Sequence, residues 1–209
     1  MRRHVGGTAF ATLCTNMKPY LAHLRGRLEG AGATLVVASV ASIDDAAARF
    51  PHAGVIINCT GGGCASLVGD DTMIPVRGQT VRVRAPEQKT FFSLVTGDKS
   101  KPFHVIPQGD GTCIVGGSKH PDDGRREPDP ELAARLLRQA AAWCPALRGC
   151  EDHVVSHTVA WRPFRRDGVR LEEEKRAGFR VVHNYGHGDV GVILAWGCAD
   201  DVVGLVQKT

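Results

Sequence analysis

The sequence lacks several features that would assign a protein to a broad class at once. No apolar run approaches the length of a membrane span, and the charged start is not followed by the apolar core of a secretory signal. Basic residues are not massed in one segment, and the formal net charge is only +4. A nucleic-acid-binding surface would need a denser basic stripe. We therefore expect a globular protein with neither a membrane nor a nucleic acid as partner.

The seven cysteines form no Cys-x-x-Cys pair. An odd number without paired spacing predicts free, mostly buried thiols in a reducing compartment. Because no histidine or cysteine spacing resembles a zinc site, we expect no metal ligands. Apolar residues make up 43% of the chain and charged residues 23%, which is ordinary for a chain that buries a core.

The first sixty residues alternate between helix and strand patterns. Apolar residues at helical spacing predict a helix over 16–30, with Asn16 as its N-cap. A strand is expected over 34–40, a short helix over 42–49, and a strand buried on both faces over 54–58. This succession is typical of a parallel α/β layer.

From about residue 77 the pattern changes to antiparallel hairpins. Strands are expected at 79–84, 90–96, 103–106, 112–115, 153–161 and 179–183. Asp129 should cap the clearest helix, which runs to Trp143, and a last helix is expected over 190–206. The fold class is therefore mixed α/β: a parallel α/β layer interleaved with an antiparallel or mixed sheet.

Three motifs point to a binding site. Asn58-Cys59-Thr60 leads into glycines 61–63 directly after a strand, where open sheets bind ligands, although a tight turn without a ligand gives the same pattern. Glycines 186, 188 and 191 open a helix whose N-terminus favours electron-rich ligand atoms, but too little chain follows for a dinucleotide fingerprint. Arg162, between Trp161 and Pro163, suits a carboxylate, although single arginines are more often exposed or internally paired.

Several segments in a fixed order carry a resemblance that none carries alone. They are residues 57–61, 75–81, 105–107, 114–117, 161–163, 168–172, 182–188 and 195–199, and they span nearly the whole chain. In this order they resemble the D-amino-acid oxidase family. The resemblance implies an FAD-binding α/β domain, here 1–75 with 179–209, interleaved with a mixed-sheet substrate domain, here 76–178.

The resemblance also implies a reaction. Members of the family are FAD-dependent flavoproteins that oxidise D-amino acids with oxygen, giving 2-oxo acids, ammonia and hydrogen peroxide. Arg162 would be the catalytic residue that clamps the substrate carboxylate and orients the α-carbon without a general base. The residues implied to contact FAD are Val40, Thr60, Gly188, Asp189, Val190, Gly191, Val192 and Ile193.

Four positions depart from the family pattern. His104 replaces one active-site tyrosine, either as a polar stand-in for it or as a strand residue that faces solvent, and Ser100 falls where a second tyrosine is usual. Asp189 replaces a glycine that faces the substrate amine; its carboxylate either attracts the ammonium group or serves the helix dipole. Ile193 replaces a threonine beside the flavin and cannot donate a side-chain hydrogen bond. His104 and Asp189 are therefore the expected further substrate contacts.

Other interpretations of the sequence stay open. D-aspartate oxidase shares these motifs and would need a further basic residue, for which Lys99 and Lys101 are candidates. The family's N-terminal dinucleotide-binding segment is absent from the sequence, which favours an inactive fragment and predicts that strands 34–40 and 54–58 lack their central neighbours. The family implies a peroxisomal location, although the chain does not end in Ser-Lys-Leu and a cytoplasmic one is the alternative. A homodimer is compatible with the resemblance.

Overall fold

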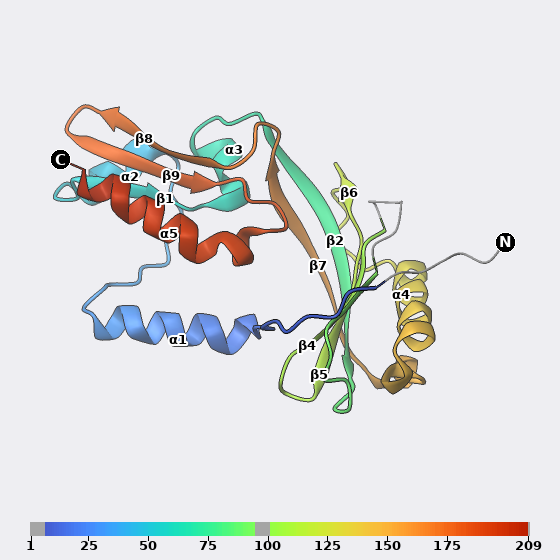
Figure 1. Cartoon of the computed structure of the whole chain (residues 1–209). Coiled ribbons are helices and arrows are strands. Elements are labelled where there is room, and N and C mark those ends of the chain that lie inside the picture. The colour runs from blue at the N-terminus through green and yellow to red at the C-terminus, as the bar shows by residue number, and fades with distance from the viewer. Residues whose placement is uncertain (1–6, 95–100, 209) are drawn as a thin grey trace.

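The computed structural model describes residues 7–94 and 101–208. The helices are α1 (Met17–Gly30), α2 (Ile43–Arg49), α3 (Cys64–Leu67), α4 (Pro130–Trp143) and α5 (Gly191–Gln207). The strands are β1 (Val55–Asn58), β2 (Met73–Arg84), β3 (Phe92–Leu94), β4 (Phe103–Pro107), β5 (Thr112–Gly116), β6 (His120–Pro121), β7 (Val154–Arg165), β8 (Arg170–Arg176) and β9 (Phe179–Tyr185). They form two sheets, which lie at opposite ends of the molecule in Figure 1.

The smaller sheet has the strand order β1-β9-β8, with β1 parallel to β9 and β8 antiparallel to β9. Helix α5 follows β9 and packs back against β8 and β9. Arg180, early in β9, donates hydrogen bonds to the carbonyls of Val206 (2.8 Å) and Lys208 (2.7 Å) at the end of α5. These bonds satisfy terminal carbonyls of the helix, so the N-terminus of α5 lies at the carboxyl end of β9.

The larger sheet runs β3-β4-β5-β2, and β6 and β7 also pair with β2. Side chains alternate between its faces. One face packs against α4 and forms the main core, which includes Val81, Val83, Val105, Val115, Leu136 and Ala140. Figure 1 shows α4 on one side of β2 and β7, and α5 on the other. The face turned away from α4 is therefore the one available for a site.

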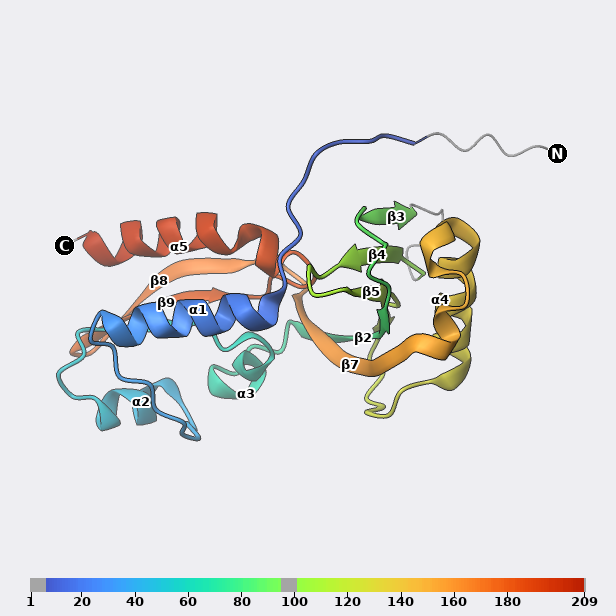
Figure 2. The same cartoon turned by 90° about the horizontal axis from the view of Figure 1, so that it is seen from below.

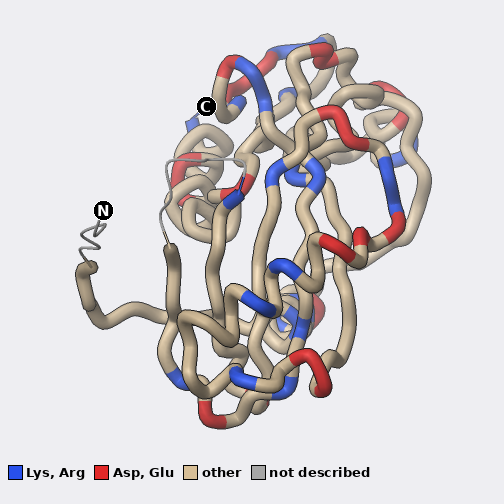
Figure 3. The backbone as a smooth tube through the Cα atoms, turned by 90° about the vertical axis from the view of Figure 1, so that its right-hand side faces the viewer, with Lys and Arg blue, Asp and Glu red and all other residues tan. Residues whose placement is uncertain are grey.

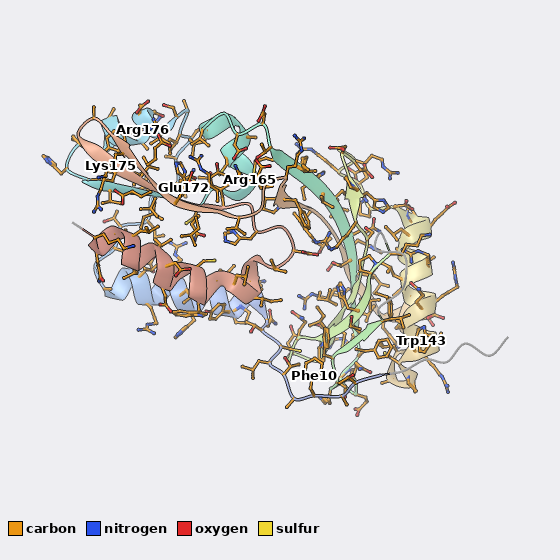
Figure 4. The ribbon with its side chains drawn as sticks, turned by 45° about the horizontal axis from the view of Figure 1, so that its top comes forward. Phe10, Trp143, Arg165, Glu172, Lys175 and Arg176 are labelled. Atoms are coloured by element: carbon orange, nitrogen blue, oxygen red, sulfur yellow. The ribbon has the colours of Figure 1, made fainter. Side chains whose placement is uncertain are left out.

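The long strands β2 and β7 connect the two sheets. They pair antiparallel from Met73↔Arg165 to Val83↔Val154, with an irregularity at Arg82. At the small-sheet end, the Asp70 carboxylate accepts hydrogen bonds from Arg165 Nε (2.9 Å) and the Tyr185 hydroxyl (2.7 Å). Figure 4 shows Arg165 between the sheets. The two sheets are thus joined by hydrogen-bonded side chains as well as by continuous strands.

Most predicted elements are confirmed, including the caps of Asn16 on α1 and Asp129 on α4. The strand predicted over 34–40 is wrong: the segment is irregular and exposed throughout, and Val37 is fully exposed. A strand buried on both faces needs hydrogen-bonded neighbours, and no other strand of the described part pairs with this segment. Strands β6 and β8 and helix α3 were not predicted. The assignment of residues 90–96 is confirmed over Phe92–Leu94, and 95–100 lie outside the described residues.

Charged residues of both signs are spread over the structure. Basic and acidic positions interleave along both sheets and their loops in Figure 3. Within residues 7–94 and 101–208, no helix combines the length and the apolar character that crossing a membrane requires.

Large apolar side chains are exposed in three parts of the structure: the irregular segment 34–40, the edge strand β1 and helix α5. They are Leu35, Val36, Val37, Val40, Ile57, Val192, Ile193 and Trp196. Strand β1 pairs on one side only, with β9, so its other edge carries free backbone groups within the described part. Four neighbouring exposed apolar side chains in 34–40, together with a free strand edge elsewhere in the fold, favour association with other apolar surfaces.

We expect the isolated chain to bind a dye that fluoresces on apolar surfaces and to aggregate as its concentration rises. Val37→Lys should reduce dye binding, because it places a charge in the exposed apolar segment. Ala33→Lys, at a nearby exposed position without a large apolar side chain, is the matched control. A sharp two-state melt with no dye binding by the unaltered chain would contradict this prediction.

Candidate active site

Arg162 lies on β7 opposite Val76 of β2, and its side chain is half-buried on the face turned away from α4. Its guanidinium lies directly over Gly78, where a Cβ would overlap it. Arg162 Nη1 donates to the carbonyl of Ser118 (3.0 Å), and within the described residues the guanidinium has no carboxylate within ion-pair distance. Burial lowers the pKa of Arg162 and the charge of Asp189 raises it, but a guanidinium stays protonated. The site therefore contains a cation with unused donors.

His104 occupies the same face of the sheet. It lies on β4 opposite Gly116 of β5, and Gly116 pairs with Thr80 of β2. The imidazole covers Gly116, where any Cβ would overlap the ring. Burial and the charge of Arg162 lower the pKa of His104, which favours the neutral ring. His104 therefore faces the arginine rather than solvent.

Asp189 and Lys119 form an ion pair beside Arg162. The Lys119 ammonium also lies 5.6 Å from the centre of the Phe164 ring. Burial alone would raise the pKa of Asp189. The hydrogen bond and charge of Lys119, together with the charge of Arg162, outweigh this effect, so the pKa is below its usual value. Asp189 is thus an ionised carboxylate between two cations, which neither interpretation of its sequence position anticipates.

The three sequence motifs meet around Pro163. A Cβ on Gly61 would lie 3.7 Å from Pro163 Cγ, and the Gly188 amide donates to the Pro163 carbonyl (3.0 Å). Gly188 has φ of +57°, and a Cβ there would come within 2.6 Å of the Phe164 ring. Only glycine fits this backbone conformation and this space. Residues from the ends of β1, β7 and β9 are therefore held together by one proline and two glycines.

The N-terminus of α5 opens onto this region. Its N-cap, Val190, provides no side-chain hydrogen bond, and the first turn contains no acidic residue. Val192 is 57% exposed and Ile193 is 80% exposed. A cavity of about 390 Å³ between α1 and α5 is lined by Gly191, Val192 and Trp196 among other side chains, and Figure 2 shows the two helices side by side. Unsatisfied N–H groups beside an apolar cavity suit an electron-rich aromatic ligand.

The residues predicted from the sequence fall into two groups. Arg162, His104 and Asp189 lie at the face of the large sheet turned away from α4. Thr60 precedes Gly61, which approaches Pro163, and the segment 188–193 runs from Gly188, bonded to Pro163, into α5. Val40 is 38% exposed in the irregular segment and, within the described part, forms no hydrogen bond with the other motifs. Ser100 and Lys99 lie outside the described residues.

Sequence reasoning missed Lys119 and a carboxylate–histidine pair. His183 Nε2 lies 3.0 Å from Glu174 Oε2, although the sequence predicts no such arrangement. The β8–β9 hairpin brings them together, since its register aligns Glu172 with His183 and places Glu174 on the same face. Recognising Arg170–Arg176 as a strand would have revealed this pair.

A family model described as FAD dependent oxidoreductase (DAO) matches residues 2–205. The chain belongs to this family. A D-amino-acid oxidase of Rubrobacter xylanophilus is 39% identical over 96% of the chain and 59% of the relative, and one of Streptomyces coelicolor is 40% identical over 92% and 58%. A human D-aspartate oxidase is 34% identical over 99% of the chain and 58% of its own length. The chain thus spans about three fifths of the length of these relatives.

Solved structures support the mixed α/β fold. Glycine oxidase from Bacillus cereus superposes with a TM-score of 0.60 at 19% identity, covering 72% of this chain and 42% of that one. L-proline dehydrogenase from P. horikoshii gives 0.58 at 16% identity, covering 74% and 43%. At these identities the likeness concerns the fold alone.

We expect the chain to lose stability as the pH falls below about 6.5. Burial lowers the pKa of His104, His183 and His187 from that value, so below it the unfolded chain binds more protons than the folded one. Stability then decreases until the folded pKa values are passed. Each histidine contributes about 1.4 kcal/mol for every tenfold difference in proton affinity between its folded and unfolded states. Urea unfolding between pH 5 and 8 measures this.

His104→Gln should flatten this dependence, whereas His157→Gln, at an exposed histidine, serves as the control. Unfolding free energies that stay level or rise on acidification would show that burial does not keep these histidines neutral.

Proposed function

We propose that this chain forms the substrate side of a flavin-dependent oxidase that converts D-amino acids and oxygen to 2-oxo acids, ammonia and hydrogen peroxide. The observation that carries the proposal is Arg162, a half-buried guanidinium with no carboxylate partner in the described part. Its planar fork can bind a substrate carboxylate in two parallel hydrogen bonds. Family membership and relatives that are D-amino-acid oxidases support it.

The neighbours of Arg162 explain how it can orient a substrate. The Ser118 carbonyl accepts a hydrogen bond from Arg162 Nη1, and the guanidinium packs directly over Gly78. A substrate carboxylate bound on the open side would have its α-carbon fixed relative to the α5 N-terminus. When binding fixes the geometry in this way, the entropy of orienting the reactants is lost on binding and no longer adds to the reaction barrier. This contribution needs no general base. His104, neutral on the same face, is available as a hydrogen-bond partner.

The residues present fit the flavin end of FAD. The glycine turn and the uncapped start of α5 offer backbone N–H groups, and the cavity between α1 and α5 is bordered by Gly191 and Val192. We propose that Thr60 and residues 188–193 hold the cofactor, with Val40 as a more distant contact. When bound, FAD supplies the hydride acceptor for the α-hydrogen and the reaction with oxygen. Ile193 offers no side-chain donor there, so backbone N–H groups carry its contribution.

The specificity of this site depends on whether Lys119 is free. D-aspartate oxidase, the alternative function, binds a substrate with a second carboxylate, and Lys119 is a second cation near Arg162. Asp189 already neutralises Lys119 in this chain. With Lys119 paired, Arg162 is the cation of this pair that is left for a carboxylate, and we propose substrates with a single carboxylate over D-aspartate.

The cellular location of the protein and its oligomeric state also stay proposals. The family resemblance predicts a peroxisomal enzyme, but two relatives come from bacteria, so a cytoplasmic location is equally compatible. Homodimerisation stays a prediction. An inactive chain is the remaining alternative, and a measurement of FAD binding separates it from the oxidase.

FAD binding to the purified chain, followed by quenching of flavin fluorescence, is the first test. If FAD binds, D-alanine should release hydrogen peroxide, and Arg162→Ala should lower kcat/KM by about 100- to 1,000-fold, because two charge-assisted hydrogen bonds are lost. Arg162→Lys keeps the charge without the fork and should be intermediate. Failure to bind FAD, or equal activity of Arg162→Ala, would overturn the proposal.

Asp189→Asn should shift the preference from D-alanine towards D-aspartate by about tenfold, since it leaves Lys119 free for a second carboxylate. Asp167→Asn, which removes an exposed carboxylate at the far side of Arg165, is the control. The ratio of kcat/KM for the two substrates is the measurement. A ratio that does not move would mean that Lys119 does not face the substrate side chain.

A further inference from the structure

A chain of hydrogen bonds crosses the small sheet from β8 through β9 to the end of β1. Glu174 Oε2 lies 3.0 Å from His183 Nε2, and His183 Nδ1 lies 3.2 Å from Asn58 Nδ2. Asn58 Oδ1 accepts from the Thr60 amide at 3.2 Å and from the Thr60 hydroxyl at 2.8 Å. The chain therefore runs from a carboxylate to the residue that follows the parallel strand.

The direction of each bond follows from the chemistry of its ends. The hydrogen bonds from His183 and Arg176 lower the pKa of Glu174, so Glu174 is an ionised acceptor and Nε2 of His183 must carry the hydrogen. Burial lowers the pKa of His183 and favours the neutral ring, which leaves Nδ1 as an acceptor. Asn58 must then turn its NH₂ group towards His183 and its carbonyl towards Thr60. The tautomer of one histidine thus determines the orientation of an amide.

The orientation of Asn58 determines in turn what Thr60 can offer. Its hydroxyl hydrogen is committed to Asn58 Oδ1, so Thr60 Oγ1 presents lone pairs on its remaining sides. Cys64 Sγ, 3.1 Å away, can occupy one of them. His183 is fully buried and Asn58 is 2% exposed, whereas Thr60 is exposed. The chain therefore ends at a surface acceptor whose direction is set from the interior.

We propose that His183 is a positioning residue: through Asn58 it orients Thr60 as a hydrogen-bond acceptor for an N–H or O–H group of the bound cofactor. The link to a cofactor rests on the proposed function, whereas the hydrogen-bond chain does not. A proton added to Nδ1 of His183 would face the NH₂ group of Asn58. The amide would have to rotate, and Thr60 would lose the acceptor of both its donors.

The charged groups around His183 bear on its protonation. On β8 the charged groups near it are Glu174, Glu172 and Arg170. On β9 the Tyr185 ring lies edge-on to the imidazole, with 5.8 Å between the two ring centres. On the packed helix α5, the acidic residues Asp200 and Asp201 are exposed. From β1 the amide of Asn58 hydrogen-bonds the ring. Glu174 is therefore the group whose removal should change the tautomer most directly.

The test uses the whole chain, with nitrogen-15 resonances of the histidine rings and of the Asn58 and Thr60 amides as readouts. At pH 7.5 we expect His183 as the Nε2–H tautomer. On acidification, the Asn58 side-chain and Thr60 backbone resonances should shift with the same midpoint as the His183 ring. An Nδ1–H tautomer at pH 7.5, or Thr60 shifts without that midpoint, would overturn the proposal even if no variant folds.

Glu174→Ala should convert His183 to the Nδ1–H tautomer and move the Thr60 amide resonance, whereas Glu172→Ala, on the same face of β8 but without a bond to His183, should change neither. Glu174→Ala should also weaken FAD binding about three- to tenfold, the effect of one hydrogen bond. Unchanged FAD binding despite a changed tautomer would overturn the positioning role. If FAD does not bind the unaltered chain, the proposed function fails, and the resonances alone decide on the hydrogen-bond chain.

Discussion

The position of the small sheet relative to the long strands β2 and β7 depends on the hydrogen bonds that the Asp70 carboxylate accepts. Its side chain is 7% exposed, and it accepts hydrogen bonds from the Thr72 amide and hydroxyl, Arg165 Nε and the Tyr185 hydroxyl. Burial raises the pKa of Asp70, but these donors together hold it well below its usual range. A buried carboxylate is stable only when its oxygens are fully paired. The donors to Asp70 come from the residue before β2, the last residue of β7 and the last residue of β9.

The position of Asp70 explains why the candidate site can form between two sheets. Arg162 lies three residues before Arg165 on β7, and the glycine turn at Gly186 begins one residue after Tyr185. Binding Arg165 and Tyr185 to one carboxylate therefore fixes the position of Arg162 relative to the start of α5. Pro163 then fills the space between, in contact with Gly61 and Gly188. A change that loosened Asp70 would disturb the site without touching any residue that faces a ligand.

The sequence predicts the elements well where local signals and packing agree. Asp129, with Pro130 behind it, identifies the start of α4 because capping is decided within a few residues. The strand over 34–40 failed for the opposite reason: its apolar pattern is sufficient for a strand only when another strand lies beside it. Lys119 and Glu174 were missed because their partners, Asp189 and His183, meet them only through sheet register or the approach of the two sheets. Arg162 was predicted as a site residue because its motif places a cation on an apolar strand; the structure places it half-buried on β7, and its role stays a prediction.

Two departures from the family pattern, His104 and Asp189, lie beside Arg162, and the charges in this part of the structure compensate one another. Asp189 adds a negative charge, which the positive charge of Lys119 balances. His104 replaces a neutral tyrosine but is kept neutral because burial and the charge of Arg162 lower its pKa. Among the side chains named here, the uncompensated positive charge is that of Arg162, whose planar donors match a carboxylate. Since the proposed recognition of an amino-acid carboxylate requires such a charge, these two substitutions are compatible with it.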